Sequence, residues 1–258
     1  MKKILTYFII LFINLNLSSQ SFDEKVTEAS NVGMTVTNVG TIGNGFNGSF
    51  NLLDYPSCEF PRGSGVEHLF EGGIWVGALV NGTVVSVSTA ALDDPSGYST
   101  GKSGFEFTAE EGASIEKRSS LFDSPDFKPS AISHEDYIAE FTDSNITVPG
   151  TNIQIQDHED PLNIEVHLET YNWNFPFSDF FIILDYTITN VGDKTLDSLY
   201  TGIWTNSVVR NVNVTPAGQG GTAFFNKGGN GYEDSLNMAY GFDATGDPGF
   251  TDSYFAHK

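Results

Sequence analysis

The chain contains 258 residues, of which 33 are acidic and 12 are basic, so its formal net charge is −21. This charge excludes nucleic-acid binding through basic patches and disfavours contact with anionic membranes, since both surfaces are themselves negative. Hydrophobic residues make up 39% of the chain and aromatic residues 13%, which is enough to form a folded core.

The N-terminus has the pattern of a secretory signal peptide. Lys2 and Lys3 precede an apolar run over residues 4–17, and the residues after it suit cleavage between Ser19 and Gln20. The alternative is an uncleaved anchor, but the run is shorter than the roughly 20 residues of a membrane span. Cleavage removes two lysines and no acid, which leaves 10 basic and 33 acidic residues and a charge of −23. With no later apolar stretch of spanning length, we expect a protein that is secreted or displayed on the outer cell surface.

The first strands are predicted over residues 32–39 and 46–53, separated by turn residues. Cys58, the only cysteine, follows in a strand-like setting over residues 55–60. No histidine is near it in sequence, so we interpret it as a buried small hydrophobic residue rather than a catalytic thiol.

The strongest local signal is a β-hairpin. Two β-rich runs, 74–80 and 83–88, are separated by Asn81 and Gly82. An Asn-Gly pair is typical of a type I′ turn, because both turn positions need a positive φ.

A loop is predicted over residues 92–104, with a brief strand pairing at Phe105 and Phe107. Residues 133–141 are the best helix candidate, because Ser133 can cap the first turn and Asp136 occupies the third helical position.

The remaining segments again predict strands. Residues 162–171 alternate between apolar and polar, whereas 179–189 is apolar on both faces and is predicted to be a central strand covered on both sides. Further strands are predicted at 196–205, 207–214 and 236–242, with a flexible loop at 228–231.

Together these segments predict an all-β fold, a large β-sandwich with a supersandwich as one variant, and one or two short helices. The domain division is a signal peptide over residues 1–19 and a β-sandwich domain over residues 20–258. We expect this domain to be the N-terminal part of a longer protein.

No catalytic motif stands out. Residues 97–103 have three residues rather than four between their glycines, so they do not form a phosphate-binding loop. His158 and His167 lack the spacing of a zinc site, although the fold could bring them together.

Acidic loops are the better metal candidates, because calcium prefers carboxylate and carbonyl oxygens. Asp157, Glu159 and Asp160 form one cluster, and Asp243 and Asp247 belong to a second. The alternative is ordinary solvated loop charge. Calcium is therefore the one cofactor that the sequence suggests.

Aromatic residues provide the candidate ligand surface. The segment 171–177 is aromatic, loop-like and interrupted by proline, and we select Tyr171, Trp173 and Phe175 as the contact residues. Phe177, Trp75 and Trp204 could extend the same sugar-stacking platform. The alternative is that these rings pack within the core.

Several motifs resemble those of a family of large secreted β-rich proteins of Bacteroidetes and related phyla, many of which end in a type IX secretion sorting domain. The motifs that carry this resemblance lie at residues 59–65, 69–78, 157–158, 161–166, 171–173, 186–192, 200–203 and 237–243. The sorting domain is not present here, and residues 204–208 lack the acidic residue that family members often carry. The resemblance implies export but no transferable catalytic role.

Two functions follow as expectations. The first is a secreted or surface-displayed structural or interaction module without a catalytic site, whose partner is a surface protein. The second is an accessory glycan-binding or glycan-active domain of a polysaccharide-degrading system, whose partner is an extracellular glycan.

Overall fold

The computed structural model describes residues 22–45, 55–92, 97–110, 112–209, 228–243 and 254–257, without the side chains of 228, 243 and 254–257. Its elements, in chain order, are β1 (Glu24–Val26), β2 (Gly33–Thr37), β3 (Thr41–Gly43), β4 (Cys58–Glu59), β5 (Leu69–Val80), β6 (Val84–Thr89), α1 (Gly97–Thr100), β7 (Glu116–Arg118), β8 (Glu135–Thr142), β9 (Ile164–Asn172), β10 (Ile183–Asn190), β11 (Leu196–Ser207), β12 (Gly228–Glu233), β13 (Met238–Asp243) and β14 (Tyr254–His257). The prediction of an all-β fold is confirmed.

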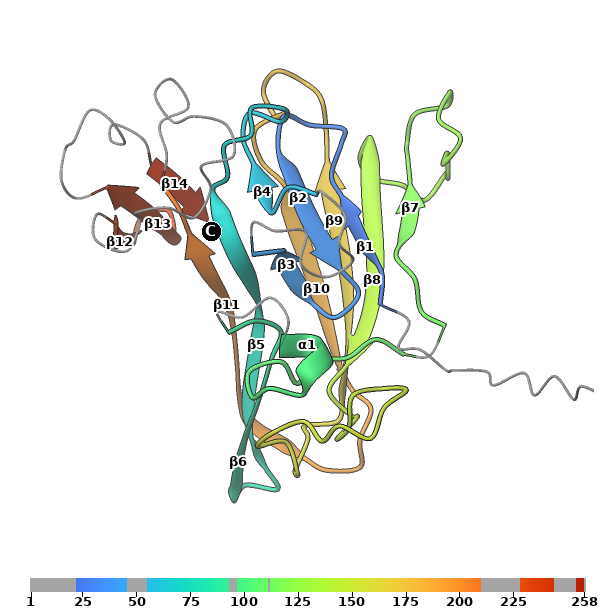
Figure 1. Cartoon of the computed structure of the whole chain (residues 1–258), viewed down its shortest axis with the longest axis vertical. Coiled ribbons are helices and arrows are strands. Elements are labelled where there is room, and N and C mark those ends of the chain that lie inside the picture. The colour runs from blue at the N-terminus through green and yellow to red at the C-terminus, as the bar shows by residue number, and fades with distance from the viewer. Residues whose placement is uncertain are drawn as a thin grey trace, which may run out of the picture.

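The strands form three antiparallel sheets (Figure 1). A seven-stranded sheet has the order β1-β2-β3-β5-β11, with β4 paired to β2 and β6 paired to β5. A four-stranded sheet has the order β10-β9-β8-β7, and a three-stranded sheet has the order β12-β13-β14. The turn between β10 and β11 carries the chain from the four-stranded sheet to the seven-stranded one.

The core lies between the two larger sheets. Val36, Ile74 and Val76 enter it from the seven-stranded sheet, and Phe141 and Val166 enter it from the four-stranded sheet. Over residues 164–169 of β9 the inward residues are apolar and the outward residues are polar, which is the alternation expected of a sheet with one solvated face. The two sheets therefore pack face to face, in the manner of a β-sandwich.

The predicted hairpin is confirmed. β5 and β6 pair from Trp75↔Thr89 to Val80↔Val84, and the turn residues Asn81 and Gly82 have φ values of 51° and 69°. Asn and Gly tolerate this left-handed conformation better than other residues do, so local chemistry fixes the turn.

The helix predicted over residues 133–141 is wrong, since β8 occupies this segment. The cap-like pattern is present, because the Ser133 N–H donates to Asp136 Oδ1 over 2.8 Å, but it closes a turn that leads into the strand. Tyr137, Ala139 and Phe141 then alternate into the core while β8 pairs with β7 and β9. Cross-strand pairing and a two-residue period override the weak local signal for a helix.

The prediction of a central strand over residues 179–189 is also wrong. β10 lies at the edge of the four-stranded sheet and, within the described ranges, pairs only with β9. Leu184, Tyr186 and Ile188 pack against the core, whereas Ile183 on the other face is 44% exposed. The second apolar face therefore belongs to the surface.

Some smaller predictions differ from the structure. Phe105 and Phe107 are buried but lie in a loop, and Thr108 next to them forms an isolated bridge with Thr142. The loop predicted at 228–231 is the start of β12. The strands predicted at 46–53 and 210–214, and the signal peptide, lie outside the described residues.

The described residues include no helix that is both long and apolar enough to cross a membrane.

Candidate functional site

The connection between β9 and the edge strand β10 carries an exposed group of aromatic rings. We call residues 173–181 the aromatic loop. Phe177 is 74% exposed, Phe180 56%, Phe175 43% and Phe181 38%. Phe175 and Phe177 stack with ring centroids 5.3 Å apart, and Phe180 meets Phe181 edge to face at 5.5 Å. Four exposed phenylalanines on one short segment form the kind of apolar patch that marks an interaction surface.

The three predicted ligand residues at this loop differ in how far their side chains are exposed. The Tyr171 side chain is buried, and its hydroxyl donates to Glu169 Oε2 over 2.7 Å. Trp173 is half-buried and lies tilted against Tyr171, with ring centroids 6.4 Å apart. Phe175 is exposed and contacts the His134 ring at 4.6 Å. Of the three predicted residues, Phe175 is therefore the most accessible and Tyr171 is a supporting residue.

The aromatic loop is fixed at both ends by hydrogen bonds. At its start, the Asn172 N–H donates to Ser133 Oγ over 2.8 Å, and the Asn174 N–H donates to His134 Nδ1 over 3.2 Å. Near its end, the Asp179 carbonyl accepts from the Asn31 N–H over 2.7 Å. The exposed rings are thus carried by a backbone that is tied to the rest of the fold.

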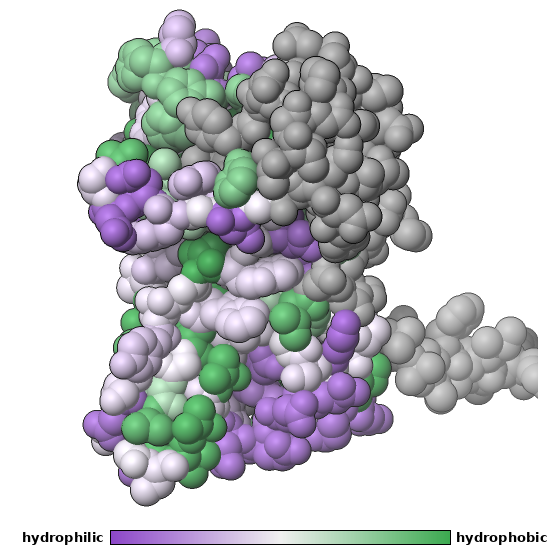
Figure 2. All heavy atoms as spheres, turned by 90° about the vertical axis from the view of Figure 1, so that its left-hand side faces the viewer, coloured by the Kyte–Doolittle hydropathy of each residue, from purple (hydrophilic) through white to green (hydrophobic). Residues whose placement is uncertain are grey.

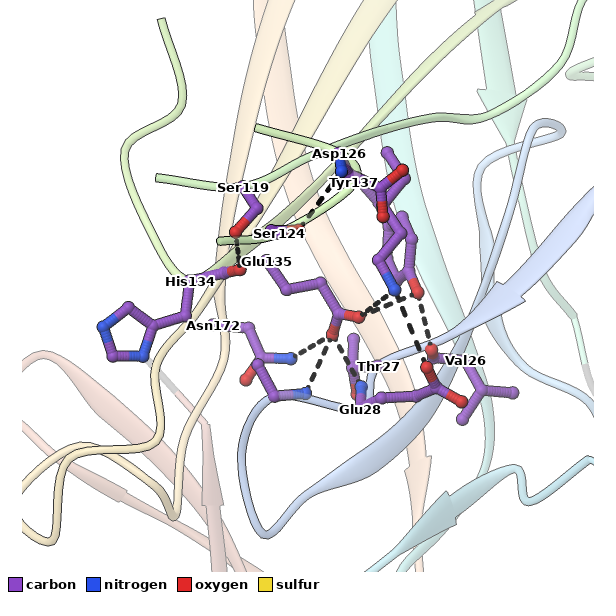
Figure 3. A network of polar contacts seen from close by, with 12 residues as sticks. Val26, Thr27, Glu28, Ser119, Ser124, Asp126, His134, Glu135, Tyr137 and Asn172 are labelled. Carbon is purple, nitrogen blue, oxygen red and sulfur yellow. Dashed lines mark hydrogen bonds and ion pairs between the residues drawn. The ribbon is translucent and has the colours of Figure 1, made fainter. Parts of the chain in front are cut away.

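A buried carboxylate, Glu135 at the start of β8, lies next to Asn172, the residue that precedes the aromatic loop (Figure 3). It is 3% exposed and accepts from five donors. These are Lys117 Nζ at 2.9 Å, Tyr137 Oη at 3.1 Å, Asn172 Nδ2 at 2.8 Å, the Glu28 N–H at 2.6 Å and the Ala29 N–H at 3.1 Å. The carboxylate therefore joins β7, β8, β9 and the turn after β1, and it supports the loop that Asn172 begins.

The same network shifts two pKa values. Burial alone would lower the pKa of Lys117, but the hydrogen bond and negative charge of Glu135 outweigh it and raise that pKa. Burial raises the pKa of Tyr137, and the neighbouring Glu135 charge raises it further. Lys117 thus stays protonated as the counter-ion of Glu135, and this assembly holds the fold together.

A pocket of about 380 Å³ lies at the β5–β6 hairpin, away from the aromatic loop. Trp75, Val85 and Val87 form its apolar wall, and the predicted acidic cluster Asp157, Glu159 and Asp160 lines the other side. All three acidic residues are exposed. The prediction that Trp75 extends the aromatic platform of residues 171–177 is wrong, because Trp75 lines the pocket with the acidic residues instead.

The second half of the predicted calcium set cannot be placed, because Asp247 and the side chain of Asp243 lie outside the described residues. Among the residues with described side chains, no group of three or more His, Cys, Asp or Glu is arranged to hold a metal ion. His158 is buried with Nε2 2.6 Å from the Asp143 carbonyl oxygen, whereas His167 contacts other residues on the outer face of β9.

Cys58 is buried, as predicted. Burial, and then the charges of Glu67 and Glu59, raise the pKa of its thiol well above the ordinary range. A protonated, inaccessible thiol is a poor nucleophile.

His167 stands between two carboxylates on the outer face of the four-stranded sheet. Its Nδ1 contacts Glu140 Oε1, and its Nε2 lies 2.9 Å from Glu169 Oε1. The hydrogen bond to Glu169 raises the pKa of His167, and the same bond lowers the pKa of Glu169.

These shifts predict a pH dependence of stability. A histidine whose pKa is raised on folding stabilises the fold below its unfolded pKa of about 6.5, and this contribution is lost as the pH rises through the folded pKa. The urea midpoint of the wild type should therefore fall more steeply above pH 6.5 than that of H167Q. Identical slopes in the two proteins would show that the imidazole does not contribute. The effect should be small, because this group of side chains is partly solvated.

Comparisons of the chain with protein-family profiles, curated proteins and solved structures found no match.

Proposed function

We propose that this chain is an exported β-sandwich interaction module that binds a protein partner through the aromatic loop. The observation that carries the proposal is the set of four exposed phenylalanines on a loop that hydrogen bonds anchor at both ends. The signal-peptide pattern and the resemblance to secreted β-rich proteins support a location outside the cell, in solution or on the cell surface.

The chemistry of the loop favours a protein partner over a sugar. Phenylalanine rings offer a large apolar surface without a hydrogen-bonding group, and such rings are strong contributors to protein interfaces. A loop that is already ordered loses little conformational entropy on binding, which favours affinity. The anchoring of Asn172 and Asp179 therefore supports binding as well as folding.

Site-specific cross-linking tests this proposal. A photo-reactive phenylalanine analogue is placed at position 177, in the protein as its native cells export it. Irradiation should give one discrete protein adduct. The matched control is position 122, because Phe122 is 89% exposed but lies on a different loop. If exposure alone caused the reaction, position 122 would react at least as strongly.

A second variant separates binding from folding. With the analogue at position 175, the substitutions F177S and F180S should abolish the adduct while the thermal unfolding midpoint stays within about 2 °C, since both side chains are largely exposed. An adduct that survives this double substitution, or one that forms equally from position 122, would contradict the proposal.

A further inference from the structure

A strip of three aromatic rings lies on the outer face of the seven-stranded sheet, on β5 and β11. Cross-strand partners point to the same face, and the register pairs Tyr200 with Gly77, Trp75 with Gly202, and Trp204 with Gly73. Each ring thus has a glycine opposite it, and the rings follow one another along the sheet in the order Tyr200, Trp75, Trp204.

The three glycines differ in their surroundings, because Gly73 lies against Ala90 and Gly77 against Val87, whereas Gly202 faces open space. The indole rings of Trp75 and Trp204 have centroids 6.5 Å apart and planes only 19° from parallel. A Cβ atom added at Gly202 would meet nothing within 4 Å, so the space beside Trp75 is open. Tyr200 is 76% exposed at one end of the strip. Trp75 and Trp204 therefore form a near-parallel pair of rings, and Tyr200 is exposed farther along the same face of β11.

The strip borders the pocket at the β5–β6 hairpin, because Trp75 belongs to both. Figure 2 views the molecule from this side, and hydrophobic and hydrophilic residues adjoin at its lower end, where β6 lies. The hydrophilic wall contains Asp157, Glu159 and Asp160. Trp75, the middle ring of the strip, therefore lines the same pocket as several hydrogen-bond acceptors.

Hydrogen bonds pre-form this site. The Trp75 Nε1–H donates to the Ala91 carbonyl over 3.1 Å, which fixes the indole. The Ser86 hydroxyl donates to the Asp160 carbonyl over 2.7 Å, which ties the acidic loop to β6. The two walls of the pocket are thus held in place without a ligand.

We propose that this strip and pocket bind a neutral oligosaccharide. The apolar faces of pyranose rings can stack on Trp75, Trp204 and Tyr200, and the sugar hydroxyls can donate hydrogen bonds to the carboxylates of Asp157, Glu159 and Asp160. A pocket with an apolar wall and a few convergent polar groups is typical of a small-molecule site, and its volume lies within the usual range of such sites.

The charges of the site select among ligands. Lys194 Nζ lies 3.9 Å from Asp160 Oδ1, but an apolar protein surface would bury the carboxylates of Asp157 and Glu159 away from water, which is costly, whereas sugar hydroxyls could donate hydrogen bonds to them. An acidic sugar would be repelled by these carboxylates and by the net charge of −21. The occupant is therefore a sugar without acidic groups, and its site shares no residue with the aromatic loop.

Titration with defined sugars tests the proposal. The probes are the neutral hexasaccharides cellohexaose, mannohexaose and xylohexaose, with hexagalacturonate as the anionic counterpart, followed by tryptophan fluorescence and calorimetry. At least one neutral probe should bind with a micromolar to millimolar Kd, and hexagalacturonate should bind at least tenfold more weakly. Binding of none of the neutral probes, or equal binding of hexagalacturonate, would overturn the proposal.

Variants then locate the binding. W75A should weaken binding at least tenfold, and Y200A and E159Q should each weaken it severalfold. The last two side chains are exposed, so these variants keep the experiment interpretable if W75A does not fold. W173A, which changes a tryptophan on the aromatic loop, should bind like the wild type. Unchanged affinity in Y200A and E159Q would overturn the assignment. The F177S/F180S variant should bind the sugar normally, whether or not the aromatic loop binds a protein.

Discussion

Replacing Glu135 by alanine should lower the free energy of unfolding by about 3–5 kcal/mol, because it removes a buried carboxylate that accepts hydrogen bonds from five donors. Lys117 Nζ loses its contact at 2.9 Å, and the N–H groups of Glu28 and Ala29 lose their acceptor. For a chain of this size the thermal midpoint should fall by roughly 10 °C. Urea unfolding and differential scanning calorimetry measure both quantities.

Two further variants identify the cause. Glu140 lies on the same strand, but its side chain is exposed, so E140A should change stability by less than about 0.5 kcal/mol. In the E135A background, K117M should recover part of the loss, because it removes a half-buried cation that has lost its nearer acceptor, with only Glu28 left at 3.6 Å, and it leaves an apolar side chain. A loss below about 1 kcal/mol in E135A, or no recovery in the double variant, would show that the network is not a major source of stability.

The sequence identified those elements whose structure is determined by nearby residues. The β5–β6 hairpin was predictable because Asn81 and Gly82 specify their own backbone conformation between two β-rich runs. The strand at 162–171 was predictable for a similar reason, since the alternation of residues along β9 itself shows which face is buried.

Elements that depend on distant partners were not predictable in the same way. The segment 133–141 carries both a cap-like pattern and a two-residue alternation, and only pairing with β7 and β9 selects the strand. In β10 the two apolar faces suggested burial on both sides, although one of them continues the exposed aromatic surface toward Ile183. Composition alone does not distinguish an apolar residue that packs in the core from one that is exposed on the surface.

The site shows the same division. Residue types were informative, because tryptophan and acidic loop residues were identified as ligand candidates. The sequence does not show which of these residues lie together. Trp75 lines the same pocket as Asp157, Glu159 and Asp160, although they are more than 80 positions apart in the chain. Glu135 and Asp143, which hold the two surfaces in place, could not be told apart from the other 31 acidic residues, because burial depends on the whole fold.

Asp143 carries the second large effect. It is fully buried just after β8, and both of its carboxylate oxygens are occupied. Ser88 Oγ at 2.6 Å and the Leu162 N–H at 2.8 Å donate to Oδ2, and the Ile164 N–H at 2.8 Å donates to Oδ1. The carboxylate thereby joins β6 to the start of β9, beside the acidic loop of the pocket.

The nearly isosteric change D143N should therefore cost roughly 3 kcal/mol, because an amide must turn its NH₂ group toward at least one of these donors. Loss of the negative charge does not by itself explain this cost. The control D185N makes the same change on the exposed face of β10 and should cost less than about 0.5 kcal/mol. S88A removes one donor and should cost about 1 kcal/mol. Urea unfolding ranks the three variants, and a D143N cost no larger than that of D185N would contradict the interpretation. Because the Leu162 N–H binds Asp143 two residues after Asp160, D143N should also weaken sugar binding at the pocket while leaving cross-linking from Phe177 unchanged.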